Sequence, residues 1–497
     1  MNFKPEITEL KLNETLFTKR VTENVQGDII VPDTKGDIGK ILQTDGVAVI
    51  DSKEINGGRI TVSGTVYVNI LYAPQDGGID SMNTSMNFTH VAKTEYDDVR
   101  LFTDCRIKSV DHSMYNTRKI NVKATVNLKL EGKREICPQI LSGCESDGIV
   151  ECRKAQITSV PVYISTSDVI PFRETFDIPS GCPSAESILK CSANFTDRDF
   201  RLLSNKAVIR GNVSVSVLYK GEDGSVTKCE FTHPFTEITD AHGAQEDMKE
   251  NIRATLSPFT AEITSNGDGD RRSFFVEGKI YVETNAYENE PVEVITDMFC
   301  TEIPLELTTR AVPDGVSFST TMISQIKDII NSGSIKEITD IVSRPVIENV
   351  SVNAGTLSVS GTADTELLCR DGNDNFFTVK KSVPFICNGS FEGANPIATA
   401  EIINPVAECA GGNAEIRMTV AVNAEGSASD GILCVTDATV SEKTSSDNIP
   451  SLTVYYARSG DTLWNIAKNF MAPVKNIREA NNLGDVIKEG QKIIIPR

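Results

Sequence analysis

The chain has 497 residues, of which 39% are hydrophobic and 24% are charged, and its formal net charge is −20. This length predicts several domains, and the composition is that of a folded, water-soluble protein. A strongly acidic surface argues against nucleic-acid binding, which needs cationic groups to neutralise phosphates. The first ten residues, MNFKPEITEL, lack the cationic start and apolar run of a secretion signal, and no apolar stretch is long enough to cross a bilayer. We therefore expect a cytoplasmic protein.

The body of the chain contains three copies of one pattern. Arg59–Tyr72, Lys206–Tyr219 and Thr356–Cys369 each alternate apolar and polar residues around a central glycine. These glycines, Gly64, Gly211 and Gly361, are 147 and 150 residues apart. Such alternation predicts strands with one buried face, and a glycine inside the strand predicts a bulge or a bend.

Each copy carries two further signals. A second alternating run follows each glycine strand and is expected to be another strand: Ile120–Leu128, Phe274–Val282 and Ile416–Val422. A proline motif precedes each glycine strand: Val31-Pro32-Asp33, Ile178-Pro179-Ser180 and Val312-Pro313-Asp314. The proline-to-glycine distance is 32 residues in the first two copies and 48 in the third, which predicts an insertion. The Ile-rich segment Thr321–Val342 is expected to form it as an amphipathic helix pair.

Together these patterns predict a mainly β fold. We expect three tandem, sandwich-like, β-rich modules with short helices, followed by a small α+β domain of strand-helix-helix-strand order. The expected modules span residues 1–145, 146–302 and 303–440, the last with the helical insertion. A linker is expected at 441–450, within the polar, turn-rich stretch Thr436–Pro450, and the α+β domain at 451–497.

The C-terminal stretch Leu452–Arg497 carries the most specific motif. Leu463, Ile466, Ala467 and Phe470 recur at helical spacing, and Ser459 or Asp461 is expected to cap that helix. Three segments in order resemble a LysM module: Tyr456 to Ala467, the turn Ala480-Asn481-Asn482-Leu483, and Glu489 to Pro496. The stretch holds seven Lys/Arg and four Asp/Glu, a net of +3, which leaves −23 on the rest of the chain.

The LysM resemblance implies a binding site. LysM modules bind glycans that contain N-acetylglucosamine, such as peptidoglycan, in a groove between two loops, here Gly460–Trp464 and Asn482–Ile487. The implied ligand- or partner-binding residues are Gly460, Asp461, Thr462, Leu463, Trp464, Asn482, Leu483, Ile487 and Lys488. Trp464 is the only tryptophan of the chain. It either stacks on a sugar or packs into the core of the module, and both interpretations stay open.

The three copies resemble the SPOCS domain, a spore-coat-associated module of spore-forming Firmicutes. The resemblance lies in the proline motif, the glycine strand and the Asp/Gly turn that follows it. Three such copies and one C-terminal LysM module are the arrangement of SipL-like spore-coat morphogenetic proteins. That arrangement implies a sporulation adaptor that acts by protein–protein interaction in the mother cell, at the forespore surface and spore coat. Its implied partner is the ATPase of the coat basement layer, of the stage IV sporulation protein A type, docked through the LysM module. The alternative is a protein that binds peptidoglycan or another N-acetylglucosamine glycan in the cell wall or spore cortex.

No pattern in the sequence indicates catalysis. The twelve cysteines form no C-x-x-C pair, and neither they nor the four histidines have metal-ligand spacing. A glycan hydrolase would need a paired-carboxylate site, which the sequence does not indicate. We therefore expect no enzyme activity, no metal site, no cofactor, no membrane insertion, and free thiols.

Overall fold

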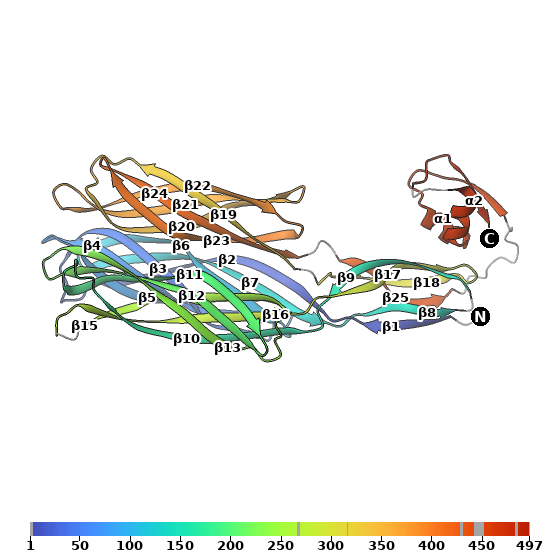
Figure 1. Ribbon diagram of the computed structural model, residues 1–497, viewed down its shortest axis with the longest axis horizontal. Coiled ribbons are helices and arrows are strands. Elements are labelled where there is room, and N and C mark those ends of the chain that lie inside the picture. The colour runs from blue at the N-terminus through green and yellow to red at the C-terminus, as the bar shows by residue number, and fades with distance from the viewer. Residues whose placement is uncertain are drawn as a thin grey trace.

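The computed structural model describes residues 3–146, 148–265, 269–315, 317–427, 431–441, 452–482 and 486–496. Figure 1 shows an elongated body with a bundle of long strands at one end and a narrower stalk at the other. A small helical unit, formed by the C-terminal residues, lies beside the stalk. The body is built entirely of strands in the part of the chain that the structure describes.

The three copies found in the sequence fold into three sets of strands. The first comprises β1 (Phe3–Glu9), β2 (Leu12–Ile30), β3 (Ile38–Asn56), β4 (Arg59–Pro74), β5 (Asp80–Lys93), β6 (Arg100–Asn116), β7 (Lys119–Ile136) and β8 (Gln139–Ser146). The second comprises β9 (Val150–Ser159), β10 (Tyr163–Asp177), β11 (Ala185–Leu203), β12 (Lys206–Gly221), β13 (Val226–Asp240), β14 (Lys249–Leu256), β15 (Thr260–Thr264), β16 (Ser273–Tyr287) and β17 (Glu290–Cys300). The third comprises β18 (Leu305–Val312), β19 (Ser317–Ile330), β20 (Glu337–Asn353), β21 (Thr356–Arg370), β22 (Phe376–Ser390), β23 (Ala394–Ala410), β24 (Asn413–Ser427) and β25 (Ile432–Val440).

Each repeat has the same topology. One sheet holds the glycine strand in its centre, in the orders β3-β4-β5, β11-β12-β13 and β20-β21-β22. The facing sheet is centred on the second alternating run, with β2-β7-β6, β10-β16-β14 and β19-β24-β23, and β15 also pairs with β16. The first and last strands form a separate ribbon: β1-β8, β9-β17 and β18-β25. The inner faces of the two sheets enclose a core in each repeat, so the expected sandwiches and strands are confirmed.

The central glycines are required by close backbone packing. The strand paired with each glycine strand is bulged opposite the glycine, for example between Ile50 and Ser52 opposite Gly64. A Cβ atom added at Gly64, Gly211 or Gly361 would lie 2.4, 2.7 or 2.0 Å from a carbonyl oxygen of that neighbouring strand. Any side chain would therefore push the bulged strand away.

The helical insertion expected in the third repeat is wrong. Thr321–Val342 forms most of β19 and the start of β20, joined by a turn at Gly333, whose φ is 72°. The proline motifs are not equivalent, because Pro32 and Pro179 stand between the two sheets whereas Pro313 follows the ribbon strand β18. The apparent extra length is therefore strand β19, which buries Met322, Ile326 and Ile330 in the sandwich core and leaves Ile323 and Ile329 exposed. The short helices expected in the modules are also absent from the described residues, where helices occur only between Leu463 and Asn481.

The three sandwiches close into a ring. The last strand of each glycine sheet contacts the first strand of the next sheet, in the pairs β5·β11, β13·β20 and β22·β3. Asn69 donates a hydrogen bond to the carbonyl of Leu189 at 2.9 Å, and Thr378 donates one to the carbonyl of Leu42. Inside the ring, Leu71, Leu218 and Leu368 from corresponding positions pack in one apolar cluster. The repeats therefore surround an approximate threefold axis.

A buried charge network joins the repeats at this axis. Lys190 pairs with Asp340 and Asp45, each at 2.9 Å, and Arg344 also pairs with Asp45 at 2.5 Å. Burial alone would lower the pKa of Lys190, but the two carboxylates outweigh it and hold that pKa above its ordinary value. All three repeats therefore contribute to the same ion cluster, the third with both Asp340 and Arg344.

The ribbons form the stalk. Its core has two apolar clusters, and each includes a corresponding residue from every repeat: Ile140, Val294 and Cys434 in one, and Leu141, Ile295 and Val435 in the other. Strand pairing never crosses between repeats in the described residues, although β8 runs to Ser146, one residue past the expected border. Thr436–Val440 belongs to β25 and not to a linker. Residues 442–450 of the expected linker lie outside the described residues.

Candidate functional site

The C-terminal domain has the expected order of elements. β26 (Leu452–Tyr456) and β27 (Lys492–Pro496) pair antiparallel, with α1 (Leu463–Phe470) and α2 (Val474–Asn481) between them. Leu463, Ile466, Ala467, Ile477, Ile493 and Ile495 form the buried core. The helices are only two turns each, so their stability rests on this shared core.

Side-chain hydrogen bonds shape the first predicted loop, and the residue that caps α1 differs from expectation. Thr462, not Ser459 or Asp461, caps α1 by accepting a hydrogen bond from the Asn465 amide at 3.2 Å. Asp461 instead accepts from the Arg458 amide and the Tyr455 hydroxyl, both at 2.7 Å. These two bonds hold the pKa of Asp461 below its ordinary value. The Asp461 side chain thus stabilises the loop that it was expected to offer to a ligand.

The predicted site residues fall into two groups. Gly460, Thr462, Asn482 and Lys488 are exposed. Leu463 is 7% exposed within the core, and Ile487 packs against that core from the second loop. The turn after Lys488 reaches the start of the first loop, because Gly490 donates to the carbonyl of Ala457 at 2.8 Å. Leu483 lies outside the described residues.

Trp464 faces the stalk. Its indole N–H donates to Asp297 at 2.7 Å, and its ring meets Phe299 edge to face with centroids 5.2 Å apart. The Arg153 guanidinium lies 5.0 Å from the indole centroid. Lys468 pairs with the same Asp297 carboxylate. Burial raises the pKa of Asp297, but the bonds from Lys468 and Trp464 outweigh burial and lower it. The sequence did not indicate these stalk residues.

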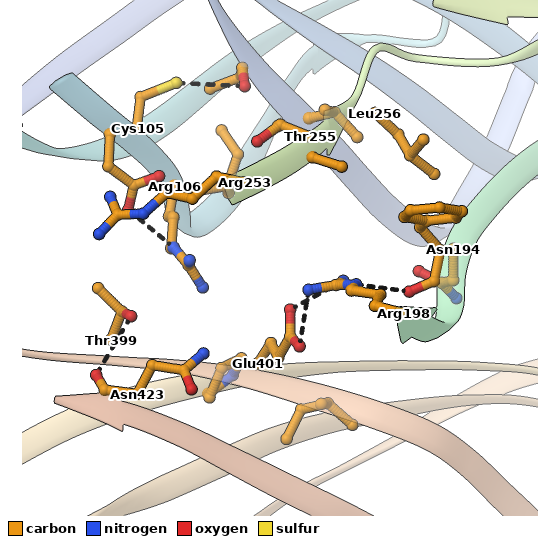
Figure 2. A pocket seen from close by; sticks show the side chains of 18 of the residues that line it. Cys105, Arg106, Asn194, Arg198, Arg253, Thr255, Leu256, Thr399, Glu401 and Asn423 are labelled. Carbon is orange, nitrogen blue, oxygen red and sulfur yellow. Dashed lines mark hydrogen bonds and ion pairs between the residues drawn. The ribbon is translucent and has the colours of Figure 1, made fainter. Parts of the chain in front are cut away.

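A large cavity between the three sandwiches is the other candidate site. Its volume is about 2630 Å³, and all three repeats line it. Figure 2 shows Arg198 and Glu401 pointing at each other there, with a closest ion-pair distance of 3.2 Å. Arg106 donates to the carbonyl of Ala400 at 2.6 Å, and Arg253 pairs with Glu425. These three arginines, which belong to the first two repeats, therefore all bond to residues of the third repeat.

Among the described residues, no group of three His, Cys, Asp or Glu side chains is arranged to hold a metal ion. Over the same residues, no helix has both the length and the apolar character needed to span a bilayer.

Comparisons with known families agree with the repeats and the C-terminal domain. The family model described as SipL, SPOCS domain matches residues 37–115 and 184–264, which cover β3 to β6 and β11 to β15. The LysM domain model matches residues 455–496. The chain carries SPOCS domains and a LysM domain. No curated protein and no solved structure matches the chain.

These domains give the general class of the protein. SPOCS domains of the SipL type indicate a sporulation-related protein, and LysM domains are peptidoglycan-binding modules. Both are non-catalytic domain types. The third repeat shares the strand order of the two matched repeats, so the body is three SPOCS-like units in one ring.

Proposed function

We propose that this protein is a non-enzymatic adaptor of spore-coat assembly. It acts in the mother cell, where its LysM domain docks the ATPase of the coat basement layer at the forespore surface. The SPOCS ring serves as a rigid body that carries this single docking module. The domain composition, SPOCS repeats followed by one LysM domain, is the observation that carries the proposal.

Charge and exposure support the LysM domain as the docking end. It carries a net charge of +3 against −23 on the remaining chain. Lys488 is exposed beside the second loop, and the side chain of Lys475 on α2 is 79% exposed. Cationic groups at the rim of an interface accelerate association with an acidic partner, whereas buried anchors supply most of the affinity. We therefore place partner recognition on the two loops and the adjoining face of α1.

Glycan binding is the second candidate function. The LysM match itself favours it, because modules of this type bind N-acetylglucosamine glycans. Exposed Thr462 and Asn482 offer hydrogen-bonding groups, and Ile487 offers apolar surface for a sugar face. Peptidoglycan of the cell wall or the spore cortex would then be the ligand.

A paired binding assay separates the two functions. The full-length protein is tested for capture of the purified coat-basement ATPase and for co-sedimentation with peptidoglycan. The Lys488→Glu variant should weaken ATPase capture most at low salt, since salt screens the rim charge. Lys206→Glu, an exposed charge reversal on β12, is the control and should bind normally. Sedimentation with peptidoglycan and no capture of the ATPase would favour the glycan function instead.

Leu463 is unsuitable for this test. Because it is buried in the LysM core, replacing it by aspartate would unfold the domain as well as alter the loop.

A further inference from the structure

The LysM domain rests on a defined surface of the stalk. Glu151 and Arg153 on β9, with Asp297 and Phe299 on β17, form this surface, which we call the platform. Phe299 is 4% exposed and belongs to the same apolar cluster as the LysM core. The Val474 amide at the start of α2 donates to Glu151 at 3.2 Å, in addition to the contacts of Trp464 and Lys468 with Asp297.

The platform is special to the second repeat. All three ribbons carry a bulge at corresponding positions, Ser142, Thr296 and Thr436, which aligns them residue by residue. Phe299 then corresponds to Glu145 and Thr439, and Arg153 corresponds to Glu6 and Thr308. Only the second ribbon therefore offers an aromatic ring and a guanidinium to the indole. The docked position follows from side chains that the other copies of the fold do not have.

Docking occupies part of the surface that we assign to the partner. Trp464 is covered by Phe299 and Arg153, and the Lys468 ammonium is paired with Asp297. A partner that uses this face of α1 must displace the stalk. The contact consists of one aromatic pair, one cation over the indole, the Lys468–Asp297 ion pair and a few hydrogen bonds, which is a small set for a competitor to replace.

We propose that the platform is an autoinhibitory dock for the LysM domain. In the docked state, Trp464 and Lys468 contact the stalk. In the released state, both side chains are available to a partner. This proposal rests on the proposed function, because it regulates the same docking face. Its consequence is quantitative: if about 90% of molecules are docked, the apparent partner affinity is about tenfold below that of the free domain.

The single tryptophan reports docking directly. Phe299→Glu installs the residue of the first repeat, which the ribbon already tolerates at that position, and should release the domain. Thr439→Glu makes the same change at the corresponding exposed position of the third repeat and is the matched control. Acrylamide quenching of Trp464 fluorescence in the full-length protein should rise in Phe299→Glu and stay at the wild-type level in Thr439→Glu.

Binding of the purified ATPase and of peptidoglycan is then compared for the same three proteins. The proposal expects at least one probe to bind Phe299→Glu up to about tenfold more tightly than wild type, with Thr439→Glu unchanged. Quenching that stays at the wild-type level in Phe299→Glu would overturn the dock. Exposed Trp464 without a gain in binding would overturn the autoinhibition while leaving the proposed function intact. If none of the three proteins binds either probe, the proposed function fails and the autoinhibition falls with it.

Discussion

Lys190 and Asp340 occupy corresponding positions of the second and third repeats, and their charged atoms lie 2.9 Å apart. Each is paired across its own sheet with the equivalent leucine, Leu218 or Leu368. The same position of the first repeat holds Gln43, which pairs with Leu71 and is 1% exposed. The three copies of this position therefore lie near one axis, where the repeats carry a cation, an anion and an amide.

This arrangement predicts a large effect of removing the cation. Lys190→Met leaves the buried Asp340 and the half-buried Asp45 without their common partner, and should lower the free energy of unfolding by about 3–5 kcal/mol. Lys206→Ala removes an exposed pair with Asp240 and should cost less than about 1 kcal/mol. Urea unfolding of both variants checks this. Equal costs would mean that the axial network does not hold the ring together.

The central glycines predict a second, sterically caused loss. Gly361→Ala places a Cβ atom 2.0 Å from the Val346 carbonyl oxygen and should cost about 1–3 kcal/mol or more. In Gly372→Ala, in an open turn of the same repeat, the added Cβ atom meets nothing within 4 Å. This variant should change the free energy of unfolding by no more than about 0.5 kcal/mol. Thermal unfolding compares the two variants. A neutral Gly361→Ala would show that the bulged strand yields easily.

Glu425 predicts a dependence of stability on pH. Burial raises its pKa, but Arg253 and then Lys129 outweigh burial and lower it to about 2. A carboxyl with a lowered folded-state pKa stabilises the fold above its unfolded pKa of about 4.3 and loses that contribution as the pH falls toward 2.

Glu425→Gln should therefore be less stable than wild type at pH 7, by about 1–2 kcal/mol after allowance for partial exposure. This difference should shrink steadily between about pH 5 and pH 2. Urea midpoints measured across that range provide the check. A difference that does not vary with pH would contradict the assigned pKa.

The sequence predicted those parts of the fold that local pattern determines. The strands around Gly64, Gly211 and Gly361 were predictable because side-chain alternation reports one buried face directly. The predicted helical insertion in the third repeat was wrong because Val312-Pro313 resembles the proline motifs of the other repeats yet follows a ribbon strand. The LysM elements followed from helical spacing and from a specific motif.

Long-range relationships were not predictable from the same patterns. From the sequence, Lys190 is expected at the surface, since a lysine is rarely buried unless it is paired. It is buried because carboxylates of the first and third repeats surround it. Trp464 had two open interpretations, and its actual neighbours, Asp297 and Phe299, are more than 160 residues away in the chain. Asp461 looked available to a ligand, but its carboxylate bonds to Tyr455 and Arg458.

The most direct test of the central claim is the position of the protein in sporulating cells. A fluorescent fusion of the full-length chain should form a shell around the forespore, and this shell should disappear when the coat-basement ATPase is removed. Lys488→Glu should weaken the shell, while Lys206→Glu should leave it unchanged. A fusion that stays diffuse in the mother cell, or a forespore shell that persists without the ATPase, would contradict the adaptor function.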